Sequence, residues 1–175
     1  PRILVNGASG AIGSAAVQLA KARGALVTAV CKTEAVEIMQ GLGADRIVDY
    51  RRDDFTATEA VYDVVLDVVP TSSLGRCRRL LREGGHYLSA ELGPWCQHPL
   101  MALWTPLARS RVQVRFPVPF YRKWEALALK ELAEAGRFTP VIDRAYPLEE
   151  IVAAATYVET GEKIGNVVIR IADDA

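Results

Sequence analysis

The fold is decided by the stretch Ile3-Leu-Val-Asn-Gly-Ala-Ser-Gly-Ala-Ile-Gly-Ser14, near the start of the chain. A short apolar strand leads into a turn rich in glycine, and small residues then continue as a helix to Ala22. A strand, a glycine-rich turn and a helix in this order are the context that a phosphate-binding loop requires. The stretch therefore predicts an anion-binding loop at the start of an α/β fold; the alternative is a plain tight turn.

The glycines of this stretch have separate roles in the predicted loop. Gly10 has no Cβ atom, so a pyrophosphate can approach its backbone, and Gly13 lets the helix pack closely against the strand. The backbone amides of Ala11 and Ile12 lie at the positive end of the helix, where an anion is stabilised. Ala8 stands at the first position of the pattern, which departs there from a strict G-x-G-x-x-G. With its flanking strands and helix, the spacing still predicts a dinucleotide-binding loop.

Apolar strands and helices alternate after this loop. The run 61–69 is almost continuously apolar, as in a strand that is covered on both faces. The remaining strands are expected at 2–6, 25–30, 46–48, 86–89 and 111–116, with helices at 14–22, from 33 through 39, at 72–81 and at 124–135. This alternation predicts an α/β fold with a doubly wound parallel sheet of six strands, the Rossmann fold, over residues 1–137. Residues 138–175 form a separate C-terminal segment, with a helix from Pro147 and a strand at 167–171.

Composition excludes several classes of protein. Half of the 175 residues are apolar, and 21 basic residues balance 21 acidic ones. This predicts a folded core and argues against nucleic acid or an anionic membrane as partner. The three scattered cysteines indicate a reducing compartment, and we expect the cytoplasm. Cys96 and His98 are too few ligands for a metal, so no metal site is expected.

The residues after the second strand bear on the choice of dinucleotide. A site for NAD places an acidic residue at this strand end, whereas Cys31 stands there, followed by Lys32. Arg51 and Arg52 follow the third strand. A missing acid and nearby cations favour a 2′-phosphate, and so NADP(H), with NAD(H) possible. The alternatives are a solvated lysine at Lys32 and arginines that balance Asp53-Asp54.

Two other enzyme classes lack support. None of the six tyrosines has a lysine four residues on, as the catalytic pair of short-chain reductases requires. His86 and His98 are the only histidines, and neither completes a nucleophilic triad. We expect His98 to be solvated and His86 to lie at the surface.

Several motifs in order carry a family resemblance. Besides the glycine loop, they are Leu42-Gly-Ala-Asp-Arg-Ile-Val-Asp-Tyr50, Tyr62-Asp-Val-Val-Leu-Asp-Val-Val69, Leu80-Leu-Arg-Glu-Gly-Gly85, Pro140-Val-Ile-Asp-Arg-Ala-Tyr-Pro-Leu-Glu-Glu-Ile151 and Val158-Glu-Thr-Gly-Glu-Lys-Ile-Gly-Asn-Val-Val-Ile169. Across nearly its whole length the chain resembles the medium-chain dehydrogenase/reductase superfamily, in its zinc-independent, quinone oxidoreductase-like branch. The resemblance implies a two-domain enzyme. This chain, which enters a strand at once and lacks an initiator Met, corresponds to the nucleotide-binding domain and a C-terminal return into an absent catalytic domain.

The resemblance also implies which residues bind the cofactor. The pyrophosphate loop is Ser9 to Gly13, Lys32 and Thr33 meet the 2′-phosphate or ribose, and Tyr50 lies near the adenosine. Val68 and Val69 lie under the nicotinamide ribose, and Lys163 and Asn166 reach the phosphates. The implied cofactor-binding set is therefore Ser9, Gly10, Ala11, Ile12, Gly13, Lys32, Thr33, Tyr50, Val68, Val69, Lys163 and Asn166. The catalytic residues are unknown.

The expected function is hydride transfer between NADP(H) and a quinone, enone, aldehyde or alcohol. Pro70 stands where the family usually has glycine, and Ala155 where relatives often have histidine. These departures keep open a non-catalytic NADP(H)-binding sensor or scaffold. A zinc-dependent alcohol dehydrogenase with its ligands in the absent domain is a weaker alternative. The expected partners are a small-molecule substrate and a second copy of the chain, paired through the edge strand Arg111–Phe116.

Overall fold

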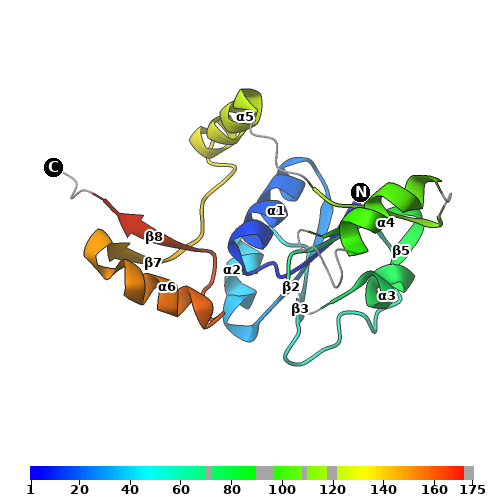
Figure 1. Ribbon diagram of the computed structural model, residues 1–175, viewed down its shortest axis with the longest axis horizontal. Helices are drawn as coiled ribbons and strands as arrows, with labels where there is room; N and C mark the ends of the chain where they lie inside the picture. The colour runs from blue at the N-terminus through cyan, green and yellow to red at the C-terminus, as the bar shows by residue number, and fades with distance from the viewer. Residues whose placement is uncertain (70–71, 90–96, 108–109, 118–121, 172–175) are drawn as a thin grey trace.

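The computed structural model describes residues 1–69, 72–89, 97–107, 110–117 and 122–171, and its centre is a six-stranded sheet in the order β3-β2-β1-β4-β5-β6 (Figure 1). All neighbouring strands of this sheet are parallel. Its strands are β1 (Arg2–Asn6), β2 (Leu26–Cys31), β3 (Arg46–Asp49), β4 (Tyr62–Asp67), β5 (Leu81–Ser89) and β6 (Val112–Arg115). The predicted doubly wound sheet of six strands is confirmed.

The order of the strands creates a switch point beside β1. The chain winds outward from β1 through β2 to β3 and then returns to place β4 on the other side of β1. Val5 is accordingly paired with Ala29 on one side and with Leu66 on the other. Connections leave the carboxyl ends of β1 and β4 in opposite directions, which opens a crevice there.

Helices cover both faces of the sheet because its inner strands are apolar on both sides. Leu4 packs into one buried cluster and its neighbour Val5 into the other. The Val5 cluster includes residues of α1 (Ala11–Ala22) and α2 (Val36–Gly41). The Leu4 cluster packs against α3 (Leu74–Cys77) and α4 (Gln97–Leu107).

Two segments differ from the sequence prediction. No helix was expected between the strands at 86–89 and 111–116, but α4 forms there and packs against β6. Thr105 of α4 accepts a hydrogen bond from the Val114 amide at 3.1 Å. The helix expected at 72–81 stops earlier: a 3-10 turn over Arg78–Leu80 follows α3, and β5 already starts at Leu81. β5 accommodates Gly84 and Gly85 through a bulge, since its register against β4 jumps from Leu81 to His86.

The C-terminal part forms a second, two-stranded parallel sheet to one side of the first (Figure 1). It follows α5 (Lys123–Glu134) and contains β7 (Ile142–Pro147), α6 (Ile151–Glu159) and β8 (Asn166–Arg170). Two contacts fix it to the first sheet's helix and loop. The Gln18 carboxamide exchanges hydrogen bonds with the backbone of Thr139, at 3.0 and 2.8 Å, and the Gly165 amide donates to the Ser9 carbonyl at 2.7 Å. The C-terminal turn therefore lies against the glycine loop.

Within the described part of the chain, no helix is both long enough and apolar enough to span a bilayer.

Candidate functional site

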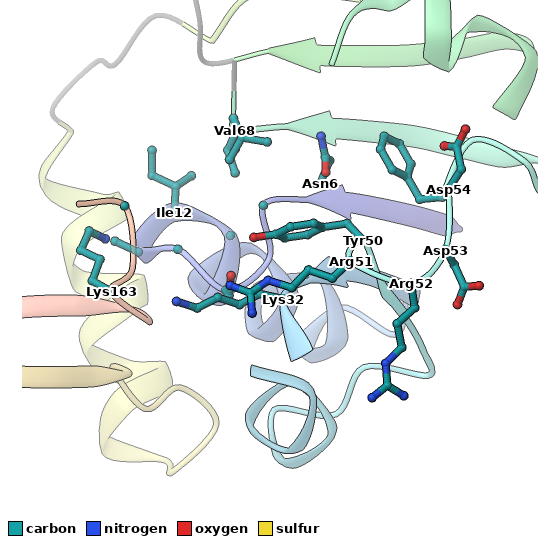
Figure 2. Close-up of a pocket in the computed structure, with 18 of the residues that line it drawn as sticks. Asn6, Ile12, Lys32, Tyr50, Arg51, Arg52, Asp53, Asp54, Val68 and Lys163 are labelled. Carbon is teal, nitrogen blue, oxygen red and sulfur yellow. The ribbon is translucent and has the colours of Figure 1, made fainter. Parts of the chain in front are cut away.

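A cleft of about 840 Å³ lies at the carboxyl ends of β1 to β4, at the switch point of the sheet (Figure 2). Figure 2 shows Asn6 and Val68 on the sheet side and Tyr50 with Lys32 opposite. The lining comes from the ends of β1, β2 and β4, the glycine loop, the loop that follows β3, α3 and the C-terminal turn. The most distant parts of the sequence thus meet where the fold predicts a ligand.

The glycine loop owes its shape to two glycines that no other residue could replace without movement. Gly7 has a φ of +84°, and a Cβ there would lie 2.6 Å from Cγ1 of Val69. A Cβ at Gly13 would lie 2.1 Å from the Gly7 carbonyl oxygen. The expected packing role of Gly13 agrees with this geometry. Sequence analysis placed Ala8 at the first motif position and missed Gly7, which makes the tight turn.

Gly10 differs from its neighbours because its missing side chain leaves space. The nearest atom to a Cβ at Gly10 is the Gly7 carbonyl oxygen, at 3.5 Å, an ordinary contact. Gly10 is the N-cap of α1 and has no side chain that could cap the first amides. The first turn of α1 carries no acidic residue. The N-terminal amides of α1 are the groups that a helix leaves without intrahelical partners. Loop and helix therefore form a cradle for an anion.

Two cations approach the cleft from β2 and β3. The Lys32 side chain is 7% exposed, and its Nζ donates to the backbone oxygen of Glu162 and lies 3.2 Å from Oε2 of that residue. Arg51 bonds Glu34 at 2.6 Å and lies 3.9 Å from Glu162. The Glu34 backbone amide and Arg51 hold the pKa of the Glu34 carboxyl below its ordinary value. Lys32 is therefore not the solvated lysine of the alternative interpretation.

The two arginines after β3 point in different directions. Figure 2 shows Arg51 extending across the cleft beside Lys32, whereas Arg52 and Asp53 point away from its centre. Arg52 pairs with Asp49 at 3.5 Å. The partners of these arginines are thus Glu34, Glu162 and Asp49, and not the Asp53-Asp54 pair that sequence analysis named as the alternative.

All but two of the predicted cofactor-binding residues line this cleft. Those that do are Ser9, Gly10, Ala11, Ile12, Gly13, Lys32, Tyr50, Val68, Val69 and Lys163. Thr33 lies beside it, where its hydroxyl donates to Asp49 at 2.6 Å and lowers the pKa of that carboxyl. Asn166 donates from its side chain to the Val141 carbonyl at 3.0 Å and so shapes the C-terminal turn.

A buried polar network behind the cleft was missed by the sequence analysis. Asp67, 1% exposed, accepts from the Asn6 side chain at 2.9 Å and from the Tyr87 hydroxyl at 2.6 Å. Burial, and then the bond to Asp67, raise the pKa of Tyr87 well above its ordinary value. The sequence signal was a polar residue at the end of each of two apolar strands. The network joins β1, β4 and β5 near their carboxyl ends, and Val68 and Val69 directly follow β4.

His98 adjoins this network, and its predicted exposure is wrong. It is 4% exposed, and its ring packs edge-on against Tyr87 at 5.8 Å between centroids. The prediction failed because His98 lies on α4, a helix that the sequence analysis did not predict.

Cys96 and Pro70 lie outside the described residues. Within the described ranges, no three His, Cys, Asp or Glu side chains are grouped to hold a metal ion, so the residues present do not fit a zinc site.

A family model described as zinc-binding dehydrogenase matches residues 42–169. The chain belongs to this family, and the predicted resemblance to medium-chain dehydrogenases/reductases is confirmed.

Three relatives illustrate the similarity. The chain is 29% identical to the mitochondrial NAD(P)H oxidoreductase RTN4IP1 of Bos taurus, covering 97% of the chain and 48% of that protein. It is 33% identical to 2-methylene-furan-3-one reductase of Solanum lycopersicum, covering 95% and 39%. The quinone oxidoreductase of Coxiella burnetii shares the fold, with a TM-score of 0.83 and 24% identity over 98% of the chain and 53% of that structure. The chain thus spans about half the length, or less, of the relatives it matches.

The expectation of a cytoplasmic location is contradicted by these comparisons. The similar oxidoreductases of Bos taurus, Mus musculus, Homo sapiens and Danio rerio are named as mitochondrial. Scattered cysteines indicate a reducing environment, and such an environment is not confined to the cytoplasm. The cysteine count therefore did not justify the assignment.

Proposed function

We propose that the protein is an NADP(H)-dependent oxidoreductase acting on quinones, enones or related carbonyl compounds, and that this chain supplies its cofactor site. The observation that carries the proposal is Gly10, whose missing side chain leaves space beside the N-terminus of α1 in a cleft at the switch point. The names of the relatives, an NAD(P)H oxidoreductase and a furanone reductase, support the same class.

The described residues fit a nicotinamide dinucleotide. The amides of Ala11 and Ile12 would hold the pyrophosphate, Tyr50 would border the adenosine, and Val68 and Val69 would border the nicotinamide ribose. The cofactor supplies the hydride, and this chain binds and orients it. Residues that act on the substrate would come from outside this chain, as the family resemblance implies.

NADP(H) is favoured over NAD(H) by the residues after β2 and β3. Cys31 ends β2, and burial raises the pKa of its thiol to about 11, so it offers no charge near neutral pH. Lys32 and Arg51 bring two cations to the same end of the cleft. Cations beside a strand end that carries no acidic residue of its own suit a 2′-phosphate.

A titration with NADPH tests the proposed function. We expect saturable binding, followed by nicotinamide fluorescence, and a loss of about 30-fold or more in affinity on Gly10→Val, because the added side chain fills the anion cradle. Gly41→Ala, at an open position on α2, is the control and should bind as the original chain does. Binding of NADPH that is equally tight with Gly10→Val would place the cofactor elsewhere.

The C-terminal segment, which we place at 138–175, is proposed to dock onto a further domain. Ile142, Ile151 and Val152 are 58%, 51% and 75% exposed there. Exposed apolar side chains gathered on one small unit favour burial against another surface. The Bos taurus relative has about half of its length outside the match, which is enough to form such a domain in that protein.

We also propose a homodimer through the edge strand Arg111–Phe116. β6 is the outermost described strand on its side of the sheet, and an apolar edge favours pairing. Leu103 and Trp104, on the adjoining α4, are 72% and 68% exposed. Because Thr105 already accepts from the Val114 amide, side chains of α4 would contribute more to this interface than backbone pairing.

Light scattering after size exclusion tests the dimer. We expect a mass of about two chains, and a shift to one chain on Trp104→Arg, since a charge in an apolar interface lacks compensation. Trp124→Arg, on the exposed face of α5, is the matched control and should remain dimeric. A monomeric original chain, or a dimer unaffected by Trp104→Arg, would contradict this interface.

A further inference from the structure

The cofactor end of β2 does have an acidic side chain, but it comes from the other end of the chain. Sequence analysis found Cys31 and no acid at this strand end. In the structure, the carboxylate of Glu162 reaches the same place from the turn between α6 and β8, and lies 3.2 Å from Nζ of Lys32. The two residues are 130 positions apart, so no local pattern could show the pair.

Lys32 depends on Glu162 for its charge compensation. Its side chain is 7% exposed, and a buried ammonium group is unfavourable without a partner. Glu162 provides two acceptors, its backbone oxygen and its carboxylate. The backbone oxygen stays in place whatever the side chain is, so the carboxylate is the part that a ligand could replace.

Arg51 is the second cation close to the Glu162 carboxylate. Nη2 of Arg51 lies 3.9 Å from the Glu162 carboxylate, and the other end of the guanidinium bonds Glu34. The Glu162 side chain is 62% exposed, so it can leave its position without breaking a packed contact. Lys32 and Arg51 both line the cleft, and Figure 2 shows them extending across it.

We propose that Glu162 sets the dinucleotide preference of this site by acting as an internal anion at the cations that a 2′-phosphate would use. A phosphorylated adenosine must displace the carboxylate from Lys32 and Arg51, whereas an adenosine with a free 2′-hydroxyl need not. Glu162 thus lowers the ratio of NADP(H) affinity to NAD(H) affinity below the value that the two cations alone would give. This inference rests on the proposed function, because it concerns the adenosine end of the same cleft.

Adenosine nucleotides without nicotinamide isolate this end of the site. We would titrate the protein calorimetrically with 2′,5′-ADP and with 5′-ADP, and repeat both with Glu162→Gln. The amide removes the negative charge at constant size, so we expect 2′,5′-ADP to bind about tenfold more tightly and 5′-ADP to change less than about threefold. Glu159→Gln, an exposed acid at the end of α6, removes a charge of the same sign nearby and should leave both affinities unchanged.

The outcomes separate this inference from the proposed function. If the original chain binds both nucleotides and Glu162→Gln leaves their ratio unchanged, Glu162 does not control preference, and the proposed function stands. An equal gain with Glu159→Gln would reduce the effect to general charge and overturn the inference. If neither nucleotide binds the original chain, the proposed function fails, and this inference fails with it. We would also prepare Glu162→Ala and record a thermal melt of every variant. The melts show whether a change in affinity comes from a change in folding.

Discussion

Replacing Gly13 by alanine is expected to destabilise the fold by about 2 kcal/mol. Its Cβ would lie 2.1 Å from the Gly7 carbonyl oxygen and 2.6 Å from Cα of Ala8, and both contacts are with backbone. Neither atom can turn aside as a side chain would, so α1 must move away from β1. Alanine is favoured over glycine within a helix by about 1 kcal/mol. Overpacking of a dense core costs about 1–3 kcal/mol, and a contact this short lies at the upper end.

Urea denaturation followed by circular dichroism measures this effect, and two glycines in the same fold provide the controls. Gly41, in α2, has no atom within 4 Å of an added Cβ, so Gly41→Ala should raise the free energy of unfolding by up to about 1 kcal/mol. Gly10→Ala should change it little, because the nearest atom is 3.5 Å away. If Gly13→Ala proved as stable as Gly41→Ala, the close approach of α1 to the loop would be absent in solution.

The comparison of these glycines shows why part of the glycine loop could be predicted from the sequence. Gly13 and Gly10 follow from spacing alone, since the chemistry of the motif is local to one strand, one turn and one helix. The role of Gly7 was missed, because glycine is required there by a positive φ and by the pair of valines after β4, which strand pairing brings close. Local patterns identify contacts within a few residues, whereas contacts between strands need the topology.

The remaining errors have the same cause. α4 was missed because its buried face carries the polar residues His98 and Thr105, while Leu100, Leu103 and Trp104 stay exposed. Pro106 also lies inside the helix, so the sequence shows no apolar stripe at helical spacing. The sheet itself was predicted well, because each inner strand is a short apolar run flanked by polar or glycine residues. The pairing of Lys32 with Glu162 joins the second strand to the last turn, and no sequence window contains both.

The buried bond between Tyr87 and Asp67 leads to the second large effect, a loss of stability at alkaline pH that depends on one hydroxyl. Burial and the Asp67 carboxylate raise the folded-state pKa of Tyr87 above the ordinary value of 10.0. A raised pKa means that the folded state keeps a proton that the unfolded state releases. This contribution to stability is therefore complete below about pH 10 and falls by about 1.4 kcal/mol for each pH unit above it.

Tyr87→Phe isolates this contribution. At pH 7 the variant should be less stable by about 2 kcal/mol, because the buried Asp67 carboxylate loses the bond that the Tyr87 hydroxyl donates. Above pH 10 the deficit should shrink, since phenylalanine has no proton to lose, and the two stability curves should converge at about pH 11.5. Urea denaturation at pH 7, 9, 10 and 11 measures both curves. Burial also raises the pKa values of the Cys31 and Cys77 thiols, which are present in both proteins. Tyr50→Phe, at an exposed position, is the control and should follow the stability curve of the original chain.

A deficit for Tyr87→Phe that stayed constant from pH 7 to 11 would mean that the Tyr87 hydroxyl is not buried against Asp67. The three strands whose ends lie beside Val68 and Val69 would then lack the hydrogen bond that joins them.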